Sequence, residues 1–144
     1  MRVTKVKVFK DVRQTISEMR RLATLYKNDI AQYATKPLTE FYDMVKNLAY
    51  IPDPTGQETI RRPGYTIRGI GPGRDCDDKA VVMASYAILN NIPWRFVVVS
   101  ASAKGPYHHV FNEFFLGGKW LPVDATYPWN ILFVSRDFPL KKVG

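Results

Sequence analysis

The chain has 144 residues and a mass of 16.5 kDa, which is the size of a single domain. An apolar share of 46% supports a packed core, and no apolar run reaches the roughly 18 residues of a membrane helix. Most of the net charge of +8 lies in residues 1–36, where nine Lys/Arg and three Asp/Glu give +6. Because no nucleic-acid motif accompanies this charge, a solvated face or an anionic partner is favoured over nucleic acid.

The first third of the chain predicts helices. Residues 3–9 alternate apolar and polar side chains and predict a short strand or arm. Apolar residues then recur at helical spacing from Val12 to Ile30, which predicts a helix that begins at an Asp11 cap and fades before Pro37. A second helix is expected from Pro37 onward. Its apolar face comprises Leu38, Phe41, Tyr42, Val45 and Leu48.

Residues 50–74 contain four prolines and five glycines, and this composition predicts a loop without a long element. A third helix is expected over residues 75–91, because Asp75 suits the N-cap position and Asp78 can complete an acidic variant of the capping box. Asn90-Asn91 before Pro93 should end this helix. Its predicted buried stripe comprises Val81, Val82, Ser85, Ile88 and Leu89.

Three strands should follow the helices, over residues 94–102, 108–116 and 119–124. Gly117-Gly118 predicts a two-residue hairpin turn between the last two strands. Helices followed by consecutive antiparallel strands are typical of the α+β class. The N-terminus offers no continuous apolar segment, so no signal peptide is predicted and a cytoplasmic location is expected.

The sole cysteine, Cys76, follows the glycine-rich turn GIGPGRD and begins the third helix. The unpaired N–H groups and the positive end of the helix dipole at this place favour a thiolate and can donate to an oxyanion. Three neighbouring carboxylates oppose the thiolate through like charge, unless they point at the helix end as caps. Cys76 is therefore a candidate nucleophile that needs a histidine partner. The three carboxylates are Asp75, Asp77 and Asp78.

The two histidines of the chain, His108 and His109, are adjacent, so in a strand their side chains face opposite sides and one at most can face Cys76. Asp124 ends the next predicted strand. A cysteine, a histidine and an aspartate in this arrangement supply a nucleophile, a base and an orienting acid. Zinc binding by Cys76, the histidines and the acidic cluster is a weaker alternative, because the cysteine has no C-x-x-C partner. No cofactor is expected.

Two segments, GPGRDCDDKAVVMASYAILNNIPWRFVVV and HHVFNEFFLGGKWLPVDATYP, resemble the transglutaminase-like superfamily, in particular its compact bacterial and phage members with a DCDD motif. Matched position by position, the resemblance puts the nucleophile on Cys76, the base on His109 and the orienting acid on Asp124. His109 stands four residues before Glu113, as the family spacing requires. In one departure, Arg74 occupies a place where glycine is the common residue.

The resemblance implies a papain-like fold, with the cysteine-bearing helix packed on an antiparallel sheet, and acyl transfer through a thioester. Hydrolysis of a peptide or isopeptide amide in a peptide or protein substrate is the favoured reaction. A protein-crosslinking transglutaminase and a component of a phage-like assembly, with a virion-associated location, are the alternatives. By residue type alone, a second oxyanion donor could be Gln57, Tyr65 or Trp94.

The predicted organisation is one transglutaminase-like domain over residues 1–144. An N-terminal arm and helices occupy residues 1–49, and the Pro/Gly-rich loop follows over residues 50–74. The core with the candidate site spans residues 75–128, and residues 129–144 form a C-terminal tail.

Overall fold

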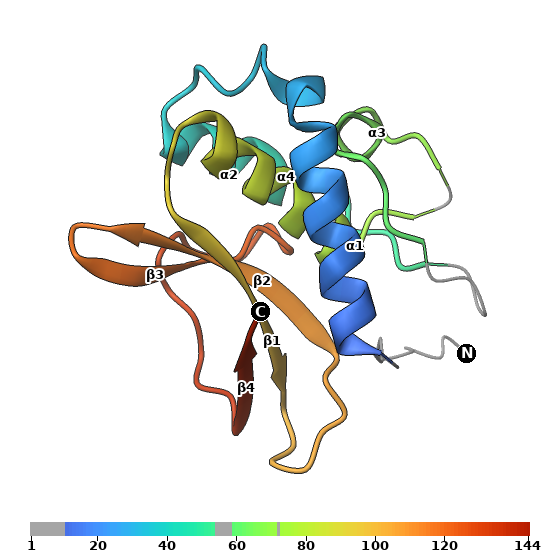
Figure 1. Ribbon diagram of the computed structural model, residues 1–144, viewed down its shortest axis with the longest axis vertical. Coiled ribbons are helices and arrows are strands. Elements are labelled where there is room, and N and C mark those ends of the chain that lie inside the picture. Colours follow the sequence, from blue (N-terminus) through green and yellow to red (C-terminus); the bar gives the residue numbers. More distant parts are fainter. Residues whose placement is uncertain (1–10, 54–58, 72) are drawn as a thin grey trace.

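The computed structural model describes residues 11–53, 59–71 and 73–144, so the strand predicted over residues 3–9 and the side chain of Gln57 lie outside the described residues. In the described parts, the helices come first and an antiparallel four-stranded sheet follows, which confirms the α+β class (Figure 1). The elements in chain order are α1 Val12–Leu25, η1 Lys27–Ile30, α2 Leu38–Lys46, α3 Pro63–Arg68, α4 Cys76–Leu89, β1 Trp94–Ser100, β2 His109–Leu116, β3 Lys119–Val123 and β4 Leu140–Val143.

The cap signals read from the sequence are present in the structure. The Asp11 carboxylate accepts a hydrogen bond from the backbone N–H of Gln14 at 3.0 Å and begins α1. Asp75 and Asp78 form the reciprocal capping box at the start of α4. Both motifs join residues three positions apart, so the chain needs no distant contact to form them.

The first predicted helix is shorter than expected. α1 ends at Leu25, and the chain continues through Tyr26 into the 3-10 helix η1. Ile30 is fully buried, as its place in the apolar stripe predicts, but it reaches the core from η1. The Asp29 carboxylate accepts hydrogen bonds from Arg62 and from the Gly64 N–H, so a contact with a distant segment shapes this turn.

The sheet has the strand order β3-β2-β1-β4, with all neighbours antiparallel. Gly117 and Gly118 join β2 to β3 with φ angles of 59° and 81°, the left-handed conformation that glycine adopts freely and a two-residue hairpin requires. β4 lies in the segment expected to be a tail. The sequence of β4, LKKV, does not alternate apolar and polar residues and so does not predict a strand. The segment is a strand because it pairs with β1.

The cysteine-bearing helix α4 is the centre of the molecule. The buried surface of α4 is wider than the predicted one-sided stripe, because every residue from Cys76 to Ala87 is buried, including Met83 and Tyr86. α1, η1, α2 and α3 contact α4, and so do β1 and β2 of the sheet. Figure 1 shows the helices gathered around α4 above the sheet. A helix that is covered on all sides lacks the one-sided apolar pattern of a surface helix, and its buried residues here include charged ones such as Lys79.

Two further observations complete the fold. The Pro/Gly-rich loop contains the short helix α3, which begins with Pro63 at its first position and is capped after Arg68 by Gly69, with a φ of 70°. α1 and α4 have 14 residues each, and no helix in the described ranges is long and apolar enough to cross a membrane.

Candidate active site

His109 and Asp124 form a direct contact. The Nε2 atom of His109 lies 2.7 Å from Oδ2 of Asp124, and both side chains are largely buried, with exposed fractions of 13% and 14%. His109 begins β2 and Asp124 follows the last residue of β3, so the antiparallel hairpin places them together. With the Nε2 proton donated to the carboxylate, the lone pair of the neutral imidazole is on Nδ1.

The Asp124 carboxylate is held as an anion. Burial opposes its ionisation, but hydrogen bonds from His109 and from Thr126 outweigh the burial and lower the pKa of Asp124 below its ordinary value. Thr126 donates to Oδ1 twice, from its backbone N–H at 3.1 Å and from its hydroxyl at 2.6 Å. The Tyr42 hydroxyl and the Asn130 amide donate to the Asp124 carbonyl oxygen. Both carboxylate oxygens and the carbonyl are therefore fixed.

Cys76 is the first residue of α4 and is buried, with an exposed fraction of 3%. It belongs to the buried cluster that contains Val98 and Val110. Two residues before Cys76, Arg74 forms an antiparallel bridge with Ile51, with backbone hydrogen bonds of 2.6 and 2.7 Å. The cysteine is thus positioned by backbone contacts on the helix side of the sheet.

Two of the three carboxylates around Cys76, those of Asp75 and Asp78, form the capping box of α4. Asp78 accepts a hydrogen bond from the Asp75 N–H at 3.1 Å as part of the capping box. The Arg61 guanidinium pairs with Asp78 at 2.9 Å, and the Arg61 N–H donates to the same carboxylate. Burial and the neighbouring Asp75 raise the pKa of Asp78, which further reduces negative charge near the thiol. The like-charge cost expected from the sequence is therefore diminished.

Two tyrosines that contact each other lie within electrostatic range of Cys76. The rings of Tyr50 and Tyr127 have centroids 5.0 Å apart. Burial raises the pKa of both hydroxyls, and negative charge on Cys76 raises it further in each case, so Cys76 lies within electrostatic range of both tyrosines. The charge of Asp124 also raises the pKa of Tyr127. Neither tyrosine belongs to a motif that predicts a site residue, although Tyr127 lies only three residues beyond Asp124.

The neighbouring histidine has a different role. The Nε2 atom of His108 accepts a hydrogen bond from the Ala101 N–H at 2.8 Å, and the His108 N–H donates to the Val99 carbonyl. Burial and the adjacent His109 lower the pKa of His108. A neutral His108 therefore closes the turn between β1 and β2, whereas His109 contacts the carboxylate.

The two described side chains that residue type suggests as oxyanion donors, Tyr65 and Trp94, have rings that lie against arginines. Tyr65 lies on α3 against the guanidinium groups of Arg62 and Arg68, at 5.2 and 5.7 Å from the ring centroid. Trp94 lies on β1, with the Arg20 guanidinium 4.8 Å from its ring centroid. Each ring thus supports an arginine on the helical side of the fold.

The acidic residues next to the cysteine also resemble a cation site. Within the described ranges, Asp53, Asp75 and Asp78 are the group whose ligand atoms lie close enough to hold a metal ion, and this group includes neither Cys76 nor a histidine. Nη1 of Arg61 lies 3.4 Å from Asp53 and 2.9 Å from Asp78. The guanidinium therefore already supplies positive charge to these carboxylates.

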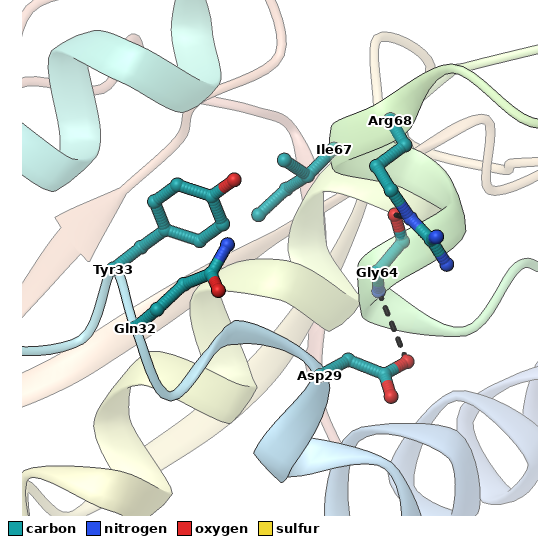
Figure 2. Close-up of a pocket in the computed structure, with 6 residues that line it drawn as sticks. All are labelled: Asp29, Gln32, Tyr33, Gly64, Ile67 and Arg68. Atoms are coloured by element: carbon teal, nitrogen blue, oxygen red, sulfur yellow. Dashed lines mark hydrogen bonds between the residues drawn. The ribbon is translucent and has the colours of Figure 1, made fainter.

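A pocket of about 190 Å³ lies between η1 and α3 (Figure 2). Asp29 and Gly64 face each other at its edge, joined by the hydrogen bond from the Gly64 N–H at 3.1 Å. The pocket contains no residue of the predicted site. Its lining residues are Asp29, Gln32, Tyr33, Gly64, Ile67 and Arg68.

The fold is of the papain-like α+β class, in which a cysteine-bearing helix packs on an antiparallel sheet. The profile of the Transglutaminase-like superfamily matches residues 22–125, and the chain belongs to this superfamily. Membership associates the chain with cysteine-based hydrolases and acyltransferases.

The other comparisons add little. No curated protein sequence matches the chain significantly. A solved structure from Cytophaga hutchinsonii, provisionally described as a cysteine protease, is similar with a TM-score of 0.48 and 17% sequence identity. The similarity covers 83% of this chain and 43% of that one, so the chain spans less than half the length of that protein.

Proposed function

We propose that the protein hydrolyses a peptide or isopeptide amide through a thioester on Cys76. In this proposal His109 is the general base and Asp124 orients it. The observation that carries the proposal is the 2.7 Å contact between His109 Nε2 and Asp124 Oδ2, in which the carboxylate is already ionised and fixed. Such a contact selects one imidazole tautomer and stabilises the imidazolium that forms during acyl transfer.

The proposed reaction begins when Nδ1 of His109 takes the proton of the Cys76 thiol and the sulfur attacks the amide carbonyl carbon. The oxyanion that forms can accept hydrogen bonds from N–H groups at the start of α4. The C–N bond then breaks, and the imidazolium gives its proton to the leaving amine. A water molecule, deprotonated by His109, attacks the thioester, which releases the acid and restores the thiol.

The exposed aromatic side chains after Asp124 favour a substrate that carries an apolar group. The Tyr127 and Trp129 rings are stacked, with centroids 4.6 Å apart and an interplanar angle of 6°. Trp129 is 72% exposed, and Ile131 and Val134 are also exposed in the same segment. Tyr127 also packs against Tyr50, so Tyr50, Tyr127 and Trp129 form an aromatic row whose last ring is exposed to solvent. A peptide with an aliphatic or aromatic side chain beside the scissile amide suits such a row.

The test is a screen of fluorogenic peptide amides, comparing wild type with Cys76→Ala. We expect amine release by wild type and a loss of turnover to background in the variant, with an unchanged melting temperature. Mass spectrometry of products formed with and without an added primary amine separates water from amine as the acceptor. Incorporation of the amine as the main product would assign crosslinking. Equal performance of Cys76→Ala in every assay would refute the enzyme proposal and favour an assembly component.

A further inference from the structure

A lysine is buried one helical turn after Cys76. Lys79 has an exposed fraction of 1%, and its ammonium lies 3.3 Å from the carbonyl oxygen of Lys46, 2.7 Å from that of Leu48 and 2.8 Å from that of Thr126. Burial of a charged group costs several kcal/mol unless its hydrogen bonds are satisfied. The three N–H donors of this ammonium match three backbone acceptors, which offsets part of the cost. Burial still lowers the pKa of Lys79 to about 8.

The carbonyl groups that Lys79 binds come from two separate parts of the fold. Lys46 is the last residue of α2 and Leu48 lies two residues beyond it, so one hydrogen bond satisfies a carbonyl group at the end of the helix and another holds the segment that follows. Thr126 lies beyond β3, in the turn that carries Asp124. Lys79 therefore joins the helix of the cysteine to the turn of the orienting acid.

The bond to Thr126 begins a continuous series of contacts. The Lys79 ammonium fixes the Thr126 carbonyl, and Thr126 donates to Oδ1 of Asp124 from its N–H and its hydroxyl. Oδ2 of the same carboxylate contacts Nε2 of His109. Each contact is 3.1 Å or shorter, so a displacement of the lysine is transmitted to the carboxylate.

We propose that Lys79 is a positioning residue, which holds the Thr126 turn so that the Asp124 carboxylate meets His109 in one orientation while Cys76 is carried by the same helix. A residue whose only task was to close α2 would need the carbonyl groups of Lys46 and Leu48 but not that of Thr126. The catalytic consequence rests on the proposed function, whereas the effect on the carboxylate does not.

Two substitutions break the series at different points. Lys79→Met keeps the length of the side chain and removes all three donors. Thr126→Val removes the hydroxyl that donates to Asp124 but leaves the Thr126 carbonyl available to Lys79. Loss of the Thr126 bonds removes one cause of the lowered pKa of Asp124, so this pKa should rise in both variants. We expect kcat to fall about 10- to 100-fold with little change in KM, because misplacement affects the reacting geometry more than binding.

Ser85→Ala is the matched control. Ser85 is buried on the same helix, and its hydroxyl lies 3.0 Å from the Ala23 carbonyl oxygen and 3.1 Å from that of Val81. Its removal should lower the melting temperature through loss of a buried hydrogen bond, but it leaves the contacts with Asp124 intact. Ser85→Ala therefore shows how a loss of stability alone affects turnover and the pKa of Asp124.

The experiment combines ¹³C NMR titration of the Asp124 carboxylate, the resonance of the His109 Nε2 proton, steady-state kinetics and thermal unfolding. The expected result is a raised Asp124 pKa and a shifted or exchange-broadened Nε2 proton in Lys79→Met and Thr126→Val, with wild-type values in Ser85→Ala. The double variant should add little to either single one.

Wild-type NMR values in a folded Lys79→Met variant would overturn the proposal. If Lys79→Met does not fold, Thr126→Val together with Lys79→Gln, which retains two donors on a shorter side chain, decides the question. The NMR measurements do not need turnover. A protein without amidase activity would therefore refute the proposed function while the positioning of Asp124 by Lys79 could still be measured.

Discussion

The histidine side and the cysteine side of the proposed site are held by different kinds of contact. On the histidine side, side-chain hydrogen bonds from His109 and Thr126 fix the Asp124 carboxylate. On the cysteine side, the capping box at the start of α4 and the backbone bridge between Ile51 and Arg74 fix Cys76. Single substitutions should therefore disable the histidine side while the fold around the cysteine persists.

The largest effect is expected for His109. His109→Ala should reduce turnover about 10³- to 10⁴-fold, because the variant lacks a base for the thiol and an acid for the leaving amine. His108→Ala is the matched control and should cost about tenfold or less, since His108 bonds to the backbone of its own turn. Amide hydrolysis rates measure both. Equal losses, or the reverse order, would show that the assignment of the base is wrong.

A smaller effect is expected for the orienting acid. Asp124→Asn should lower kcat about 10²- to 10³-fold without unfolding. The asparagine amide can turn its NH₂ group toward Nε2 of His109, which favours the imidazole tautomer with the proton on Nδ1, the atom that should take the thiol proton. Glu113→Gln is the control, since Glu113 is a buried carboxylate of the same sheet that pairs with Arg95 and Lys141. Kinetics and thermal unfolding are measured together. An Asp124→Asn variant that unfolds, or that stays fully active, would leave Asp124 a structural residue.

The exposed aromatic row should affect binding more than chemistry. Trp129→Ala should raise KM about fivefold for peptide amides with an aromatic residue beside the scissile bond, which corresponds to the loss of about 1 kcal/mol of ring contact. The same variant should treat glycine amides as wild type does. Steady-state kinetics on both substrates give the comparison. An equal change for the two substrates would place the substrate side chain elsewhere.

The smallest effect concerns stability at low pH. The lowered pKa of Asp124 means that the folded protein binds fewer protons here than the unfolded chain, so this stabilisation is present above about pH 4 to 5 and is lost as the pH falls through the folded pKa. The stability difference between wild type and Asp124→Asn should therefore shrink on acidification. Urea unfolding from pH 7 to pH 3 measures it. A difference that does not vary with pH would show that the carboxylate is not held as an anion.

Much of the site region could be anticipated from the sequence, because its signals are short in range. Asp75 and Asp78 stand at capping-box spacing, and Gly117-Gly118 demands a tight hairpin. Once that hairpin forms, the strand carrying His109 and the end of the next strand lie side by side, which leads to the contact with Asp124. The catalytic roles of these residues remain predictions.

Contacts between distant segments could not be anticipated in the same way. The sequence indicates that α1 continues to Ile30, but the hydrogen bonds between Asp29 and the segment around Arg62 and Gly64 accompany a break after Leu25. The lysine-rich edge strand β4 has no pattern of its own and exists through its pairing with β1. Both outcomes involve contacts with residues that are distant in the sequence.

The sequence by itself determined the helix caps, the hairpin, the α+β order and the superfamily, because each depends on residue types at short, fixed spacing. Only the tertiary structure decided that α4 is covered on all sides, that Tyr50 meets Tyr127, and that Lys79 reaches Thr126 across 47 positions of sequence. A buried ammonium takes whichever carbonyl groups the packing brings within reach, and no local pattern encodes which ones they are.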